Sequence, residues 1–335
     1  MAYIYKKSIN GKTYYYLRIS KRTKTGVITK DIAYLGNDAG KIYDRLKEIP
    51  AKHKEEIRKA YRNIKKAVES EHYLAIAKEA KIKQDDYIEP VLLLKAEAAK
   101  AHYNSVFLKL DPKTMHEAYH NFLIEFAYNT TSIEGNTITL PEAERLLKEN
   151  LTPKDREPRE IFDLQNTKKA FFYLIEEKPK INEEILAIIH DMLIENIDKR
   201  KGYRMQDIRV FKSHFDASPA EYVKADIGIL FKWYEANKSK LHPLVISAAF
   251  HHKLEKIHPF HDGNGRTGRM MMNYMLMLFG YPPVIIPKKS RPDYLNALSK
   301  ADKAKLDEAE PKYYKELANY LASEMADSYW NCFLV

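Results

Sequence analysis

Most of the reactive chemistry in this chain lies in one short stretch, residues 258–269, which read HPFHDGNGRTGR. A glycine-rich loop that runs into a helix leaves backbone N–H groups free at the positive end of the helix dipole, which suits a phosphate. Arg266 and Arg269 lie three residues apart, so both can project from one helix face toward further phosphate oxygens. Asp262 offers the hard oxygen that Mg²⁺ prefers, and His258 can accept a proton near neutral pH.

The sequences on either side of this stretch predict two helices that hold it in place. Apolar side chains recur at helical spacing from Leu244 to Ile257, and residues 270–278 are almost entirely apolar. Residues 258–269 are therefore expected to connect two core helices. From residue 91 to residue 335 the pattern is mostly helical, with breaks at prolines.

The first part of the chain has a different character. Residues 1–38 are rich in Tyr, Ile and Val and carry turn signals at Asn10-Gly11 and Thr25-Gly26, which predicts a small three-stranded antiparallel sheet. Residues 39–90 are rich in Lys and Glu, with apolar positions at helical intervals, and predict a helical linker. We therefore expect a mainly α protein with a sheet domain at 1–38, a linker at 39–90 and a helical core at 91–335.

The sheet segment interleaves tyrosines with basic residues, and the whole chain has a formal net charge of +10. Such a surface could stack on bases and contact phosphates, so nucleic acid is one partner that residues 1–38 could bind. Tyrosines also favour strands, however, and lysines protect sheet edges from aggregation. Both explanations remain open.

The cysteine content and the distribution of apolar residues indicate the cellular compartment of the protein. It has a single cysteine, Cys332, which excludes an intramolecular disulfide framework and favours a reducing compartment. The first residues have no apolar signal-peptide core, and the most apolar run, at 270–278, is too short to span a bilayer. We expect a soluble, cytoplasmic protein that is not associated with a membrane.

Two segments depart from the helical pattern. Val210 to Val223 alternates weakly and contains Pro219, which indicates either a short β-hairpin or an ordinary loop. The helix expected at about 116–135 ends at Gly135, which places Glu134 in its last turn. A carboxylate is unfavourable at the negative end of a helix dipole, so Glu134 is expected to have a cationic partner unless it is merely a surface residue.

The stretch from His258 to Arg269 resembles the signature of the Fic family, His-Pro-Phe-x-Asp/Glu-Gly-Asn-Gly-Arg-x-x-Arg, at every defined position. The resemblance covers about residues 91–327. It continues at Gly202-Tyr203-Arg204, Asn273, Gly280-Tyr281-Pro282-Pro283 and Arg291-Pro292-Asp293-Tyr294. It implies a Fic-type helical core and AMPylation, the transfer of AMP from ATP to a protein hydroxyl. Family members that transfer phosphate or phosphocholine are alternatives, and UMP and GMP remain open.

The resemblance also implies roles for individual residues. His258 resembles the base that deprotonates the target hydroxyl, and Asp262 the residue that holds Mg²⁺ on the α and β phosphates. The nucleotide-binding residues would be Gly263, Asn264, Gly265, Arg266, Gly268 and Arg269. A target-docking flap would include Val210, Phe211, Lys212, Ser213 and His214. Tyr294 and Leu295 match a nucleoside-binding region less closely.

Thr130-x-x-x-Glu134-Gly135 resembles the inhibitory motif of family members whose inhibitory helix precedes the catalytic loop. It implies an ion pair between Glu134 and Arg269 that would displace the γ phosphate of ATP. In some relatives this glutamate instead positions water to remove AMP, so a predominantly deAMPylating enzyme is an alternative. The implied partners are ATP and a protein with a Ser, Thr or Tyr hydroxyl, and self-modification and a homodimer remain open.

Two other functions are compatible with parts of the sequence. His251, His252, His258, His261 and Asp262 cluster in sequence as the ligands of a zinc hydrolase could, but no His-Glu-x-x-His helix is present and Pro259 interrupts the helix. The second rival is a regulatory protein that associates with nucleic acid through residues 1–38.

Overall fold

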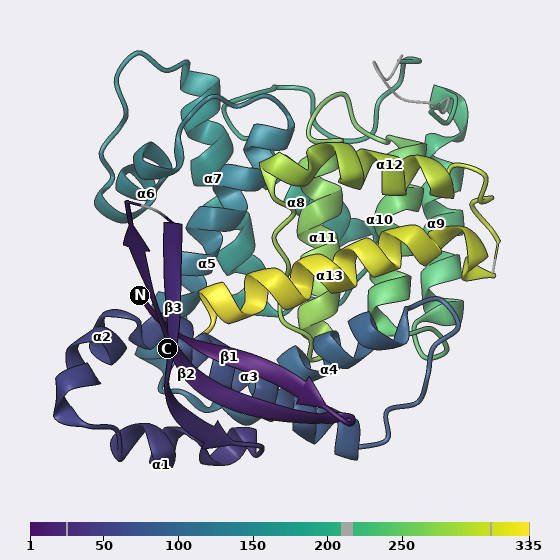
Figure 1. Ribbon diagram of the computed structural model, residues 1–335. Coiled ribbons are helices and arrows are strands. Elements are labelled where there is room, and N and C mark those ends of the chain that lie inside the picture. Colours follow the sequence, from purple (N-terminus) through teal and green to yellow (C-terminus); the bar gives the residue numbers. More distant parts are fainter. Residues whose placement is uncertain (25, 209–216, 309, 335) are drawn as a thin grey trace.

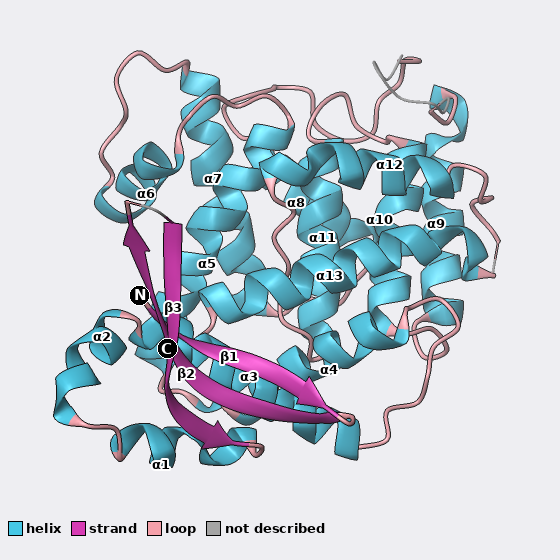
Figure 2. Ribbon diagram, viewed as in Figure 1, coloured by secondary structure: helices cyan, strands magenta, loops and turns pink. Residues whose placement is uncertain are grey.

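The structure is a computed structural model that describes residues 1–24, 26–208, 217–308 and 310–334. In these ranges a three-stranded antiparallel sheet comes first, and the chain that follows is mostly helical (Figures 1 and 2). The predicted mainly α fold with a small N-terminal sheet is thus confirmed.

The sheet has the strand order β1-β2-β3, with β1 at Ala2–Ile9, β2 at Lys12–Thr23 and β3 at Gly26–Gly36. The turn between β1 and β2 falls at Asn10 and Gly11, which both have positive φ (+48° and +75°), as the tight hairpin turns that match strand twist require. One face of the sheet packs on the helices that follow it, α1 (Ile42–Lys47), α2 (Lys54–Lys59) and α3 (Tyr61–Glu79).

Helix α3 belongs to two hydrophobic clusters. Ile64 and Val68, in its first half, are buried with the sheet, whereas Tyr73 and Ala77, near its end, are buried with the helical core. A polar contact adds to this packing, because Lys66 Nζ donates to Asn331 Oδ1 of the last helix at 2.7 Å. The segment predicted to be a linker is therefore packed against the parts of the chain on either side of it.

The helical core has two central helices, α10 and α11, with α5 and α7 on one side of them and α9 on the other (Figure 1). Six of its helices, α4, α5, α6, α7, α10 and α12, carry a proline in the first turn, where the missing N–H costs no hydrogen bond. The core helices are α4 (Pro90–Ser105), α5 (Pro112–Ile133), α6 (Leu140–Glu149), α7 (Pro158–Glu177), α8 (Glu183–Leu193), α9 (Val223–Asn237), α10 (Pro243–Ile257), α11 (Asn264–Leu278), α12 (Arg291–Ala301) and α13 (Lys315–Cys332).

The two helices predicted to flank residues 258–269 are α10 and α11, and most of their side chains are buried. The loop between them is therefore anchored at both ends in the core. Of the helices in the described ranges, none combines the length and the apolar character needed to cross a membrane.

The predicted hairpin at Val210 to Val223 falls mainly on residues 209–216, so Val210, Phe211, Lys212, Ser213 and His214 lie outside the described residues. The described rest of this segment, residues 217–223, contains no strand. Ala220–Tyr222 forms a 3₁₀ turn, and α9 begins at Val223.

Candidate active site

The loop between α10 and α11 turns at two residues with left-handed backbone, His258 (φ +51°) and Gly263 (φ +78°). The side chain of Asn264 closes the loop, since it accepts from the N–H of Phe260 and donates to its carbonyl, both at 2.9 Å. Phe260 is buried and stacks on His190 with ring centres 3.6 Å apart. Both polar atoms of the Asn264 side chain are thus used in hydrogen bonds within the loop, and its backbone remains available to a ligand.

A buried arginine from outside the loop holds its first residues. Arg204 is 1% exposed, its Nε donates to the carbonyl of His258 at 2.8 Å, and its backbone N–H donates to the carbonyl of Pro259 at 2.9 Å. Its Nη1 donates to the carbonyl of Gln206 at 3.0 Å. This role of Arg204 could not be predicted from the sequence, because its acceptors are backbone carbonyls that only the fold brings together.

His258 is oriented to accept a proton through one ring nitrogen. Its Nδ1 lies 3.3 Å from the carbonyl oxygen of Glu255, so this nitrogen can carry the proton and donate it, which leaves the lone pair on Nε2. Burial lowers the pKa of His258, and the nearby Arg204 charge acts in the same direction. The imidazole is therefore neutral at pH 7 and able to act as a base.

Asp262 lies at the start of α11 between two arginines. Its Oδ1 accepts from the N–H of Gly263 at 2.6 Å and from Arg266 Nη2 at 3.1 Å, and its Oδ2 pairs with Arg159. Burial alone would raise the pKa of Asp262, but the charges of Arg266 and Arg159 lower it overall, so the group is ionised. Asp262 is one of several carboxylates that line the pocket, and Mg²⁺ is usually held by one or two carboxylates together with phosphate oxygens, so Asp262 fits this role.

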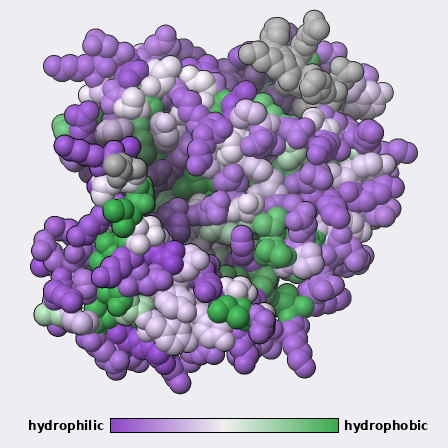
Figure 3. Space-filling model, viewed as in Figure 1, coloured by the Kyte–Doolittle hydropathy of each residue, from purple (hydrophilic) through white to green (hydrophobic). Residues whose placement is uncertain are grey.

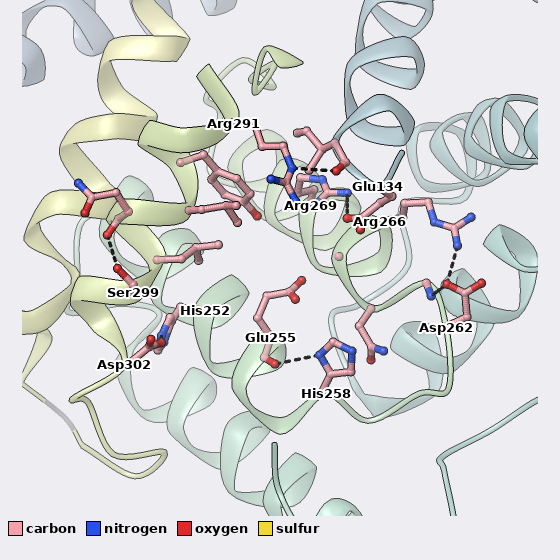
Figure 4. Close-up of a pocket in the computed structure, with 18 of the residues that line it drawn as sticks. Glu134, His252, Glu255, His258, Asp262, Arg266, Arg269, Arg291, Ser299 and Asp302 are labelled. Carbon is pink, nitrogen blue, oxygen red and sulfur yellow. Dashed lines mark hydrogen bonds and ion pairs between the residues drawn. The ribbon is translucent and has the colours of Figure 1, made fainter. Parts of the chain in front are cut away.

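Arg269 is buried beneath the end of α5 and makes three hydrogen bonds there. Its Nε donates to Thr130 Oγ1 at 2.8 Å, and its Nη2 donates to the carbonyl of Thr130 at 3.0 Å and to Glu134 Oε1 at 2.7 Å. Arg291 Nε donates to the carbonyl of Ile133 at 3.0 Å and so holds the end of α5 from the other side (Figure 4). The carboxylate at the unfavourable end of this helix thus has a cationic partner in Arg269.

The carboxylate of Glu134 lies directly over the first turn of α11. A Cβ added at Gly265 would collide with Glu134 Oε1 and would come within 2.9 Å of Arg269 Nη1. Burial raises the pKa of Glu134, but the Arg269 charge lowers it overall, so the contact is an ion pair. Glu134 therefore occupies the space next to the helix N-terminus in which a phosphate was predicted to bind.

These residues surround one pocket of about 530 Å³ (Figure 4). Most of the predicted site residues in the described ranges line it, whereas Gly268 and Thr130 do not. Thr130 lies behind Arg269, to which its side chain is hydrogen-bonded. A Cβ at Gly268 would lie 2.5 Å from the His251 side chain of α10, so this glycine permits the close packing of α10 and α11. The predicted residues that line the pocket are Glu134, His258, Asp262, Gly263, Asn264, Gly265, Arg266 and Arg269.

The far end of the pocket is formed by α12, which sequence reasoning assigned only loosely. Tyr294, Leu295 and Leu298 line it at positions that share one helix face. Tyr294 is 1% exposed, and its hydroxyl lies 2.5 Å from His251 Nε2. This end combines Tyr294, Leu295 and Leu298 with the polar Asn296 and Ser299, and such a mixed lining beside cationic groups suits a nucleotide.

Sequence reasoning also missed Glu255, whose carboxylate points into the pocket between His258 and Arg269 (Figure 4). Its Oε1 has no hydrogen-bond partner in the part of the chain that the structure describes. Burial raises the pKa of Glu255 from an ordinary 4.5 to about 7, and the neighbouring charge of Glu134 adds to this, whereas Arg269 acts in the opposite direction.

Stability should therefore depend on pH through Glu255. In the folded protein the Glu255 carboxyl stays protonated up to about pH 7, whereas in the unfolded chain it ionises near pH 4.5. Between these two pH values the folded state binds the extra proton, so the free energy of unfolding decreases as pH rises from about 4.5 to about 7. The loss should be about 3 kcal/mol. Glu255→Gln should raise the thermal midpoint at about pH 8 and change it little at about pH 4.

The matched control for this measurement is Glu177→Gln, a change of the same kind at an exposed position on α7. It should shift the thermal midpoint little at either pH. An equal effect of Glu255→Gln at both pH values would contradict the raised pKa.

The histidines that cluster in sequence have separate partners in the fold. His251 Nε2 bonds the hydroxyl of Tyr294, and His252 Nε2 lies 2.9 Å from Asp302 Oδ1. In the described ranges, no three His, Cys, Asp or Glu side chains are grouped so that they could hold a metal by themselves.

A model of the Fic/DOC family matches residues 180–276. The chain is 32% identical over 210 residues to a protein adenylyltransferase Fic of Drosophila ananassae, a match that covers 60% of this chain and 40% of that protein. The chain thus spans less than half the length of this relative.

Two solved structures resemble the fold closely. A Fic domain containing signaling protein from Bacteroides thetaiotaomicron matches with a TM-score of 0.64 at 25% identity, over 70% of this chain and 94% of that one. A Fic family protein from Desulfovibrio desulfuricans matches with a TM-score of 0.60 at 25% identity, over 76% and 77% of the two chains.

Proposed function

This chain contains a domain of the Fic/DOC family, and from this we propose that the protein transfers AMP from ATP to a hydroxyl side chain of a target protein. One observation carries the proposal. His258 presents a neutral ring, with Nε2 available, at the edge of a pocket that also holds the first turn of α11 and Arg269. This combination provides a base and a phosphate site within one cavity.

In the proposed reaction, ATP lies with its nucleoside against α12 and its phosphates at the first turn of α11. The backbone N–H groups at this turn and Arg266 and Arg269 bind phosphate oxygens. Asp262 would hold Mg²⁺, which when bound neutralises phosphate charge. His258 accepts the proton of the target Ser, Thr or Tyr hydroxyl through Nε2, and the hydroxyl oxygen bonds to the α phosphorus. The bond from this phosphorus to the β-bridging oxygen breaks, and pyrophosphate leaves.

We further propose that Glu134 inhibits this transfer. Its ion pair with Arg269, at 2.7 Å, engages the arginine that would hold the γ phosphate, and its carboxylate lies over Gly265. A negative charge at this point repels the anionic phosphates and competes for the same guanidinium. ATP would bind productively only after Glu134 moves away.

A second activity at this site, hydrolytic removal of AMP from a modified target, also has support. The side chain of Glu134 is 45% exposed even though it is paired with Arg269, and it lines the pocket. An ionised carboxylate in this position can accept a proton from an attacking water molecule. Glu134 would then restrain the forward reaction and serve the reverse one.

The target protein could be another copy of this chain, in which case self-modification would be seen, and a homodimer would favour it. The single cysteine of the chain fits a cytoplasmic setting, where ATP is available.

The chemistry of transfer can be tested with two labels on ATP. With cell lysate as the source of targets, label on the α phosphate should appear on protein, because AMP retains this phosphate. Adding the chain should not raise label from the γ phosphate above that of lysate alone, because this phosphate leaves with pyrophosphate. Protein labelled only from the γ position would show phosphate transfer instead, and labelling from neither would reject the proposed function.

A further inference from the structure

The sheet at the start of the chain carries much of the positive charge of the protein. Residues 1–38 contain eight Lys or Arg and two Asp, a formal charge of +6 (8 − 2) out of +10 for all 335 residues. Lys21, Arg22 and Lys24, near the tip of the β2–β3 hairpin, are exposed. The sheet therefore presents a positive surface that attracts polyanions.

A row of tyrosines crosses one face of the sheet. Tyr5 of β1 pairs with Tyr16 of β2, which pairs with Tyr34 of β3, so the three side chains lie on one face. Their ring centres are 6.4 Å (Tyr5 to Tyr16) and 5.3 Å (Tyr16 to Tyr34) apart, and Tyr14 lies 6.4 Å from Tyr34. These four residues form a continuous aromatic row, which we call the tyrosine row.

The tyrosine row lies on the outer face of the sheet. Leu17 and Ile19 point to the opposite face and are buried against the helices that follow the sheet. Tyr34 is 49% exposed, and the other rings of the row are partly exposed. The space-filling view shows a pale patch over β1 and β2, next to darker hydrophilic side chains (Figure 3).

Basic side chains accompany the row on the same face. Arg18 is two residues from Tyr16 along β2, and its Cζ lies 3.4 Å from the ring centre of Tyr5. Lys7 faces Tyr14 across the strands and is exposed. Arg18 is partly neutralised by Asp31, at 2.6 Å, so exposed lysines such as Lys7 are the better phosphate ligands.

We propose that this face binds single-stranded nucleic acid. Bases of a single strand have free faces that can stack on the tyrosine row, whereas in a duplex these faces are covered by neighbouring bases. The lysines beside the row would contact the phosphates of the same strand. This site is far from the pocket in sequence and does not rest on the proposed AMP transfer.

The test uses the full chain and a fluorescent single-stranded DNA of about 16 nucleotides, measured by anisotropy. Affinity should fall as salt is raised from about 50 to 200 mM. The double variant Tyr16→Thr/Tyr34→Thr, which keeps β-branched residues in the strands, should bind about 5- to 100-fold more weakly. Lys7→Gln with Lys12→Gln should make the dependence of log affinity on log salt shallower by about one unit.

Two controls isolate stacking. Tyr61→Ala removes a tyrosine that is 55% exposed on α3, outside the row, and should leave binding unchanged. The thermal midpoint of each variant shows whether the sheet still folds. Lys7 and Lys12 are exposed, so their substitution tests phosphate binding without a change in packing. RNA of the same sequence shows which sugar is preferred.

The proposal would be overturned by either of two results. One is the absence of single-strand binding at about 50 mM salt. The other is binding that a duplex matches in affinity and that the tyrosine substitutions leave unchanged, since this would indicate attraction by charge alone.

Discussion

Replacing His258 with alanine should lower AMP transfer by about 100- to 10,000-fold, the usual contribution of a general base. The imidazole is held by the carbonyl of Glu255 so that Nε2 can accept the target proton, and alanine provides no acceptor there. Transfer is measured as protein labelled from α-labelled ATP. Binding of ATP, followed by calorimetry, should stay close to that of the unaltered protein, because His258 contacts no phosphate in the proposed reaction.

The chain offers a matched control three residues later. His261 lines the same pocket from the same loop, yet no hydrogen bond orients its ring among the contacts described. His261→Ala should therefore keep most of the transfer. If His258→Ala labelled protein as fast as the unaltered chain, another group would have to be the base.

Replacing Glu134 with glycine should increase AMP transfer by about 10- to 100-fold. This range corresponds to the roughly 1.5–3 kcal/mol contributed by a hydrogen bond to a charged group. Without Glu134, the Arg269 guanidinium is released from its 2.7 Å contact, and the space over Gly265 becomes open to phosphate. The readout is again α-label on protein, with and without lysate, so that self-modification is measured separately.

Glu134→Gln distinguishes charge from bulk at this position. The amide keeps the size of the side chain and can still accept from Arg269, but it has no negative charge to repel phosphate, so its effect should fall between those of glutamate and glycine. Unchanged transfer in both variants would contradict inhibition by Glu134. If these variants also stop the release of AMP from a target labelled beforehand, Glu134 has the hydrolytic role as well.

The parts of the site that could be predicted from the sequence are those whose residues lie close together in the chain. His258, Asp262, Arg266 and Arg269 lie within one stretch between two strongly apolar helices, so their proximity follows from the helix-loop-helix alone. Glu134 lies far away in sequence, but a carboxylate at the negative end of a helix dipole favours a cationic partner, and the resemblance to the Fic family implied Arg269.

Other features could not be read from the sequence because they depend on contacts between distant elements. Arg204 is part of the family resemblance, but its function became visible only when the fold surrounded it with the carbonyls of the loop. Glu255 resembles a surface glutamate, and only the packing of α10 beneath Arg269 makes it a buried carboxyl. The side chain of Asn264 holds Phe260 across the loop, a contact that the sequence did not indicate, and its predicted place in a phosphate site depends on its backbone.

The way in which residues 39–90 connect the sheet and the helical core also could not be predicted from the sequence. Periodicity predicted helices at residues 39–90 but could not show what they pack against, and α3 proved to be shared between the sheet and the core.

Helix α3 has a consequence for how the two ends of the molecule act together. Its 19 residues form a rod of about 28 Å, with one end fixed in each hydrophobic cluster, so the sheet cannot reorient without unpacking one of them. If the sheet were joined to the helical core by a flexible linker, the pocket could take many positions relative to a ligand bound to the sheet. A rigid rod instead gives a high effective concentration at a fixed separation and almost none elsewhere. If the sheet binds a single strand and the pocket transfers AMP, as proposed, proteins bound to that strand at this separation would be the favoured targets.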